Sequence, residues 1–140
     1  MGIKINGFFA VAFASFASFG GYIIGGIDSL VLVLFGIVLL DYITGMIASF
    51  IEGTLSSKVG LKGIAMKIFI FAVVATAHFI DSLIWENNML RDATIFFYIL
   101  NEVISILENA GRAGLPIPTF LVNAVELLKQ KVKSKNNSKK

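Results

Sequence analysis

Long apolar runs separated by short polar segments dominate the chain. Residues 5–27 carry no charged side chain, and residues 29–51 carry a single one, Asp41. A third run covers residues 64–85, and a shorter fourth run covers residues 93–107 with Glu102 inside it. A helix needs about 20 mostly apolar residues to cross a bilayer. The pattern therefore predicts an all-α membrane protein with four transmembrane helices, the fourth completed by its polar flanks.

Glycine, proline and polar residues mark the connections between the runs. Residues 25–28 predict a tight turn, residues 52–63 a loop with three glycines and two serines, and residues 111–118 a helix stop with two prolines. Beyond this stop, Leu121, Val125, Leu128 and Val132 recur on one face of an amphipathic helix. We therefore expect a transmembrane domain over residues 1–118. Residues 119–140 should form the amphipathic helix and a disordered, basic cytoplasmic tail.

Composition supports a bilayer as the solvent of this chain. Apolar residues make up 56% and charged residues 15%, against about 25% charged residues in soluble domains. The net charge of +3 is unevenly placed, because half of the basic residues form a C-terminal group, the basic tail: Lys129, Lys131, Lys133, Lys135, Lys139 and Lys140. On an apolar body such a tail indicates contact with an anionic membrane surface. No nucleic-acid-binding pattern accompanies it, so we expect no nucleic-acid partner.

The distribution of basic residues also predicts a topology. Four crossings would place the N-terminus, the 52–63 loop and the tail on one side of the membrane, with eleven of the twelve Lys and Arg residues. The other side would hold Arg91 alone, among Asp28, Asp81, Glu86 and Asp92. Because cytoplasmic loops are enriched in Lys and Arg, we expect both termini in the cytoplasm.

Small residues line one face of the first two runs. In the first run this face comprises Ala10, Ala14, Ala17, Gly21 and Gly25, and in the second run Gly45 and Ala48 follow Asp41 on one face. Helices in lipid associate through close contact at small residues. The pattern is typical both of packing within one chain and of an oligomer interface, and the sequence leaves these two interpretations open.

Polar side chains inside the apolar runs are the candidate functional residues. Ionisable groups in a membrane must be paired, neutral or in contact with water. The fourth run in particular carries a continuous polar stripe. Our candidates for pore-lining or gating residues are Asp41, Lys67, His78, Asp81, Tyr98, Asn101, Glu102, Ser105, Glu108 and Asn109. The alternative is pairing within one chain, for example between Glu102 and Lys67.

No pattern of residues indicates an enzyme. The chain has no Cys and a single His, which argues against a thiolate or His-based metal site. Phosphate-binding loops, nucleophile elbows and HExxH helices are absent from the sequence. We therefore expect no catalytic residue, no metal and no cofactor.

Four motifs in chain order resemble those of a known family. They are Asp41-Tyr42-Ile43-Thr44-Gly45; Ser56-Ser57-Lys58-Val59-Gly60-Leu61-Lys62-Gly63 with Lys67; Ala77-His78-Phe79-Ile80-Asp81; and Asn101-Glu102-Val103-Ile104-Ser105-Ile106-Leu107-Glu108-Asn109 followed by Gly114-Leu115-Pro116-Ile117-Pro118. These strings are similar to motifs of the phage-lysis and toxin-secretion holin family: D-x-x-T-G, S-S-K-x-G-x-x-G-x-x-x-K, A-H-x-x-D, and N-E-x-x-S-I-x-E-N followed by G-x-P-x-P. The resemblance covers about residues 30–118.

The resemblance implies a holin. Such a protein accumulates in the cytoplasmic membrane of the bacterial host and forms homo-oligomers that open lesions. The lesions release an endolysin or a secreted toxin, with which the holin makes no stable contact, and so time host lysis. Two other classes remain open from the residues alone: a small ion channel or transporter, and a membrane scaffold whose polar stripe binds a partner subunit.

Overall fold

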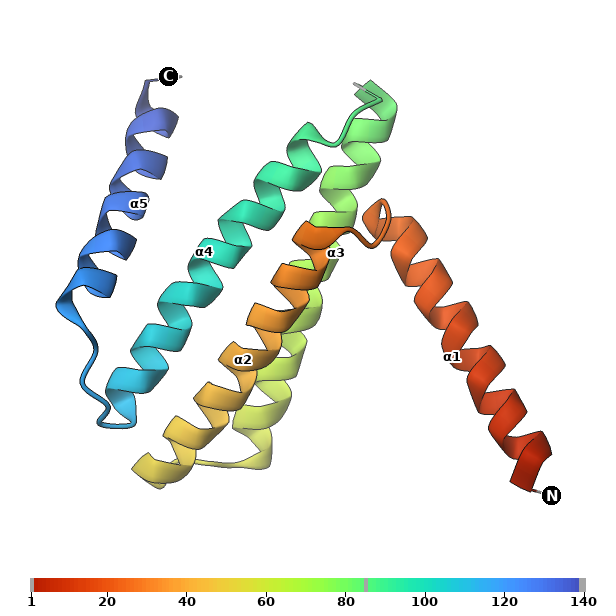
Figure 1. The fold of residues 1–140 in the computed structure, drawn as a ribbon, viewed down its shortest axis with the longest axis horizontal. Helices are drawn as coiled ribbons and strands as arrows, with labels where there is room; N and C mark the ends of the chain where they lie inside the picture. The colour runs from red at the N-terminus through yellow and green to blue at the C-terminus, as the bar shows by residue number, and fades with distance from the viewer. Residues whose placement is uncertain (1, 85, 139–140) are drawn as a thin grey trace. The chain divides into compact units, whose positions relative to one another are not determined.

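The apolar runs fold into helices throughout. The structure, a computed structural model, describes residues 2–84 and 86–138. Five helices follow one another in these ranges (Figure 1): α1 (Gly2–Ile24), α2 (Ser29–Glu52), α3 (Ser57–Ile84), α4 (Met89–Arg112) and α5 (Thr119–Asn137). The chain divides into two compact units, residues 1–35 with 65–98 and residues 36–64 with 99–140. The predicted all-α class is confirmed.

Three of the described helices are long and apolar enough to cross a membrane: residues Lys4–Ile24 of α1, α2 and α3. The sequence predicts four spans, and α4 is the difference. It carries Arg91, Asp92, Glu102, Glu108 and Arg112 within its 24 residues. Each charge at membrane depth costs about 2.5–3.5 kcal/mol on insertion scales. Length and composition alone therefore do not qualify α4 as a span.

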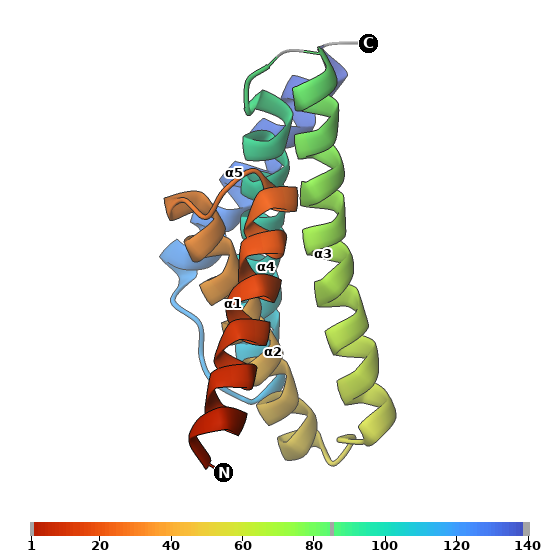
Figure 2. The ribbon, with the colours of Figure 1, turned by 90° about the vertical axis from the view of Figure 1, so that its right-hand side faces the viewer.

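The connection between α2 and α3 is much shorter than the predicted 52–63 loop. Gly53, with φ 73°, follows the end of α2. The hydroxyl of Ser56 then accepts a hydrogen bond from the backbone N–H of Val59 (3.2 Å), which caps the N-terminus of α3. As a result α3 begins at Ser57 and runs without interruption through Gly60 and Gly63 (Figure 2). The loop prediction was wrong for residues 57–63.

Gly60 and Gly63 serve close packing of α3 on Tyr42 of α2. The Tyr42 hydroxyl donates a hydrogen bond to the carbonyl oxygen of Gly60 (3.4 Å). A Cβ atom at Gly63 would lie 3.1 Å from Cε2 of the Tyr42 ring. The absence of a side chain at Gly63 therefore lets the aromatic ring lie directly against the helix backbone.

Two further helices extend beyond their predicted ends. α4, which covers Met89–Arg112, extends past both ends of the predicted run 93–107, because the polar residues on either side of the run are also helical. α5 continues to Asn137, into the segment for which the sequence predicts disorder. No Gly or Pro lies between Thr119 and Asn137, and Lys and Gln have high helix propensity. Lys139 and Lys140 of the basic tail lie outside the described residues.

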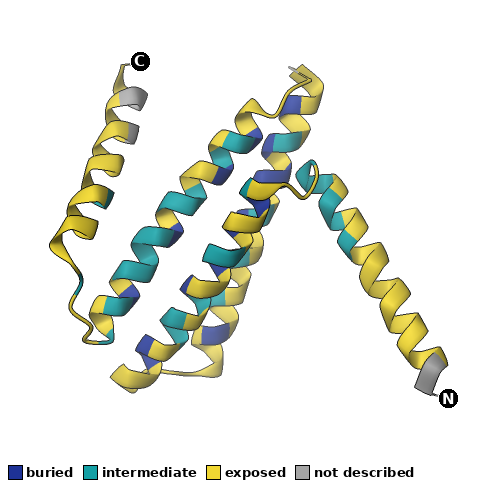
Figure 3. Cartoon of the chain, viewed as in Figure 1, coloured by how far each residue is buried: buried dark blue, intermediate teal, exposed yellow. Residues whose placement is uncertain are grey.

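The first unit buries little of α1. Most residues of α1 are exposed (Figure 3), and Phe8, Phe13 and Phe16 are among them. Of the predicted face of small residues, Ala17, Gly21 and Gly25 are half-buried, whereas Ala10 and Ala14 are exposed. The core of this unit comes from the other helices and includes Leu34, Val74 and Ile95. Packing within the chain thus accounts for only the C-terminal half of the small face.

Exchange of Gly63 for Ala should destabilise the protein relative to the same exchange at Gly36. Both substitutions gain the preference of helices for Ala over Gly, about 1 kcal/mol. A Cβ atom at Gly36 meets nothing within 4 Å, whereas one at Gly63 meets the Tyr42 ring, and overpacking costs about 1–3 kcal/mol. Circular dichroism in detergent micelles should therefore give a lower unfolding midpoint for Gly63→Ala than for Gly36→Ala. Equal midpoints would show that the ring moves aside at no cost.

Candidate functional site

A fully buried arginine, Arg91 of α4, organises the polar groups of the first unit. Its side chain is 0% exposed. Nε donates to the carbonyl oxygen of Ile24 (2.7 Å), and Nη2 donates to that of Gly26 (2.8 Å). Nη1 donates to Asp28 Oδ2 (2.7 Å) and to Asp92 Oδ1 (3.0 Å). One guanidinium thereby ties the α1–α2 turn to the start of α4.

This turn leaves carbonyl groups that only an outside donor can satisfy. The last carbonyls of a helix have no partner within the helix, and the oxygen of Ile24 ends α1. Gly25 and Gly26 have φ values of 89° and 101°, in the left-handed region that favours glycine. A cation at this place also interacts favourably with the negative end of the helix dipole. Arg91 therefore supplies both the donors and the charge that the end of α1 requires.

Asp28 completes the ion pair on the outer side of the turn. Its side chain is 50% exposed. The hydrogen bond from Arg91 lowers the pKa of Asp28 below its ordinary value, against a smaller effect of burial that raises it. Burial would lower the pKa of Arg91, but the hydrogen bonds to Asp28 and Asp92 outweigh it and raise this pKa. Both groups are thus held in their charged forms.

Asp81, a predicted pore-lining candidate, is completely buried and caps α4. Its two carboxylate oxygens accept hydrogen bonds from the backbone N–H groups of Leu90 (3.0 Å) and Arg91 (2.8 Å). The first N–H groups of a helix lack partners within it, and a carboxylate there is favoured by the helix dipole. Within the single chain, Asp81 therefore has hydrogen-bond partners in the backbone of α4 and a structural role.

His78 lies under the same turn. A Cβ atom at Gly25 would lie 2.5 Å from Nδ1 of His78, so the imidazole occupies the space that a side chain at this position would need. Within the described part of the chain, this buried Nδ1 has no hydrogen-bond partner. Gly25 is therefore required both for its φ and for the close approach of His78.

The second unit contains a separate polar network around Asn109 of α4, which is buried. Its Nδ2 donates to Oδ1 of Asp41 (2.8 Å), to the Asp41 carbonyl oxygen (3.1 Å) and to Thr44 Oγ1 (3.0 Å). The predicted small face of α2 receives it: a Cβ at Gly45 would lie 3.4 Å from this Nδ2. Asp41 itself is 5% exposed. The D-x-x-T-G segment and the end of the N-E-x-x-S-I-x-E-N segment thus meet here.

Arg112 extends this network to the surface. It donates from Nη1 to Asn109 Oδ1 (3.2 Å) and from Nη2 to Ser49 Oγ (3.2 Å) and Glu52 Oε2 (2.8 Å). Its side chain is 41% exposed. We call the set Asp41, Thr44, Ser49, Glu52, Asn109 and Arg112 the α2–α4 network. It runs from a buried carboxylate to an exposed ion pair.

The predicted polar stripe of α4 separates into two lines. Glu102 and Asn109 are buried, and Tyr98 and Ser105 are half-buried. Asn101 and Glu108, on the neighbouring line, are exposed. Lys67 of α3 is half-buried. Pairing within the chain thus accounts for Asn109 and Asp41, while the outer line is still open to solvent, lipid or another protein surface.

Two arginines of these networks were missed as site residues. In the sequence, Arg91 is only a topology signal, and Arg112 is not among the candidate site residues. A signal for Arg91 was present, since it is the one cation among Asp28, Asp81, Glu86 and Asp92. As for metal ions, no group of three or more His, Asp or Glu residues that could hold one occurs within residues 2–84 and 86–138.

Substitution of Arg91 by Lys should destabilise the protein strongly although the charge is kept. A lysine cannot reproduce the planar fork of donors, and each hydrogen bond to a charged group contributes about 1.5–3 kcal/mol. The matched control is Arg112→Lys, because exposed ion pairs contribute about 0–1 kcal/mol and Arg112 is exposed. Thermal unfolding in micelles should separate the two variants. A similar midpoint for both would contradict a clamp at Arg91.

Comparison with known proteins places this arrangement in context. The sequence matches the Bacteriophage holin family over residues 18–130. An uncharacterized protein of Listeria monocytogenes is 50% identical over 110 residues, 79% of this chain and 79% of that protein. One of Clostridium perfringens is 40% identical over 112 residues, 79% of this chain and 82% of the relative. One of Bacillus subtilis is 32% identical over 118 residues, with 84% and 88% covered.

No solved structure matches the chain. The family match includes both polar networks, since it extends from the last turns of α1 into α5. Together with three helices apolar enough to cross a bilayer, it identifies a membrane protein. The chain belongs to the bacteriophage holin family.

Proposed function

We propose that this protein acts as a holin: it oligomerises in the bacterial cytoplasmic membrane and opens lesions that release an endolysin or a toxin. Family membership supports the holin class. The observation that carries the proposal is the α2–α4 network, a set of polar side chains that extends from the buried Asp41 to an exposed ion pair in a chain with many exposed apolar side chains. Such a network provides polar groups that can line a water-filled opening once the helices separate.

The network offers two alternative sets of partners for the same groups. In the single chain, Asn109 satisfies Asp41, and Arg112 satisfies Asn109. Each of these hydrogen bonds contributes about 0.5–1.5 kcal/mol, or about 1.5–3 kcal/mol where a charged group takes part. Exchange for equivalent bonds to water or to a second copy therefore changes the free energy by only a few kcal/mol. Two packings so close in energy are sufficient for a switch.

The exposed line of α4 would assist the exchange. Asn101 and Glu108 are accessible in the single chain, and polar groups at membrane depth are accommodated against protein or water rather than lipid. A second copy would cover them at high density in the membrane. The large exposed Phe and Leu side chains of α1 and α2 suit lipid contact before that stage.

Release of a folded cytoplasmic protein would test the proposal. The gene is expressed from an inducible promoter in a bacterium that contains a soluble fluorescent reporter, and the cell wall is removed enzymatically. Membrane potential and reporter release are then followed in time. We expect a delay, abrupt depolarisation and loss of the reporter. Depolarisation with full retention of the reporter would instead indicate a small channel or transporter, and an intact potential at high accumulation would indicate a scaffold.

The α2–α4 network should control the length of the delay. Asn109→Ala removes the donor to Asp41 and leaves a buried carboxylate oxygen with one partner fewer, at a cost of about 1–3 kcal/mol. The packing of the single chain, in which Asn109 satisfies Asp41, is thereby weakened, so depolarisation should begin earlier at equal protein accumulation. The control is Asn123→Ala, which removes an exposed asparagine of α5. An unchanged delay for Asn109→Ala, or the same change in both variants, would exclude this network as the timing element.

A further inference from the structure

Helix α5 borders a groove with α4 along one edge, and its apolar side is exposed. Val122, Val125, Glu126 and Lys129 line a groove together with Ile104, Leu107 and Glu108 of α4. At 100° per residue these four positions of α5 share one side of the helix. Val125 is the half-buried residue among them. The edge that meets α4 therefore includes both the acid and the first lysine of α5.

The apolar side of α5 faces away from this groove. It comprises Phe120, Leu121, Ala124, Leu127 and Leu128, which lie within about 120° of one another around the helix. Phe120 is 72% exposed and Leu127 60% exposed. Exposed apolar side chains that gather on one face mark a surface for contact with a membrane or a partner. The helix is thus amphipathic, but its apolar side is turned outward.

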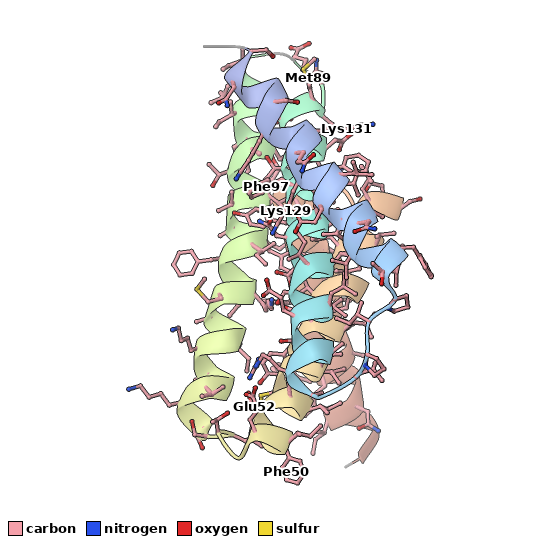
Figure 4. All side chains as sticks on the ribbon, turned by 90° about the vertical axis from the view of Figure 1, so that its left-hand side faces the viewer. Phe50, Glu52, Met89, Phe97, Lys129 and Lys131 are labelled. Carbon is pink, nitrogen blue, oxygen red and sulfur yellow. The ribbon has the colours of Figure 1, made fainter. Side chains whose placement is uncertain are left out.

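Positive charge follows this apolar side directly. Lys131 and Lys133 are exposed, and Figure 4 labels Lys131 beyond Lys129 on α5. Past Glu126 the chain carries lysines and no acidic residue. An apolar face together with a cluster of lysines on the same helix is the pattern of a helix that lies in the interface of an anionic bilayer. A nucleic acid would match the charge but would leave the apolar half in water.

We propose that α5 is a peripheral membrane-binding helix whose partner is the anionic lipid surface of the bilayer that holds the rest of the chain. Phe120, Leu127 and Leu128 enter the boundary between headgroups and acyl chains. Lys131 and Lys133 bind the phosphate groups of anionic lipids. The same chain contains three helices, α1, α2 and α3, that are apolar enough to cross a bilayer, so a membrane surface is available to α5. The contact does not depend on lesion formation.

Spin labels on the two sides of α5 would test this in the full-length protein. The chain contains no Cys, so Leu128→Cys and Gln130→Cys each give a unique site, and two residues of separation place them about 200° apart on the helix. Both positions are exposed. Each variant is reconstituted in nanodiscs of phosphatidylcholine alone or with phosphatidylglycerol. Collision with oxygen, which partitions into lipid, is compared with collision with a water-soluble nickel chelate.

In discs with phosphatidylglycerol, we expect the label at Leu128 to collide mainly with oxygen and the label at Gln130 mainly with nickel. In phosphatidylcholine the label at Leu128 should shift toward nickel. Equal nickel accessibility of both labels in anionic discs would overturn the proposal. Protection of the Leu128 label from both reagents would also overturn it, because a protein surface would then cover this side. Immersion that is the same in both lipids would overturn the assignment of anionic headgroups.

The lysines supply a second measurement on the same label. Lys131→Gln with Lys133→Gln should reduce the ratio of immersed to free label at Leu128 by about fivefold for each lysine removed. The matched control is Lys58→Gln with Lys62→Gln, which removes the same charge from exposed positions of α3. An equal reduction by both pairs would assign the effect to net charge and contradict the proposed contact. Reporter release can succeed or fail independently of these results.

Discussion

Hydrocarbon offers no hydrogen-bond partner, and this constraint governs the placement of polar side chains in the structure. Asp81 accepts from the first N–H groups of α4, Arg91 donates to the last carbonyl of α1, and Asn109 donates to Asp41. The first two interactions satisfy backbone groups that every helix end leaves open. Some polar residues of this apolar chain therefore serve to satisfy the backbone groups at helix ends, which apolar side chains cannot do.

The two networks differ in how easily they could exchange partners. Arg91 is fully buried and holds two backbone carbonyls, which remain in any arrangement that keeps the turn. Loss of Arg91 would leave those carbonyls without donors. The α2–α4 network instead consists mainly of contacts between side chains, and one end of it, Arg112 with Glu52, is exposed. Water can replace those contacts group by group. The α2–α4 network is therefore the better candidate for a switch. The contacts of Arg91 should stay in place.

The periodicity of a sequence predicts features that lie within one helix. It does not predict features that depend on the contact between two helices. The apolar runs over residues 5–27 and 29–51 predicted α1 and α2 closely. The spacing of Asp41, Gly45 and Ala48 predicted that they share one face of α2, and Asn109 of α4 meets this face at Asp41 and Gly45. The glycines at 60 and 63 indicated a loop, because a glycine that permits close packing and a glycine that turns the chain are identical in sequence. Only the position of Tyr42 distinguishes them. Likewise the partner of Asp41 lies 68 residues away, and no pattern along one helix reveals such a pair.

The intermediate character of α4 follows from the same constraint. Asn109, on its inner line, is satisfied within the chain by Asp41. Its outer line, with Asn101 and Glu108, is exposed and would be costly against lipid. With five charged residues, α4 does not qualify as a membrane span by length and composition, yet it buries Ile95 completely. Such a helix is best accommodated between protein on one side and water or further protein on the other. A single chain provides the first of these surfaces, and assembly of several chains would provide the second.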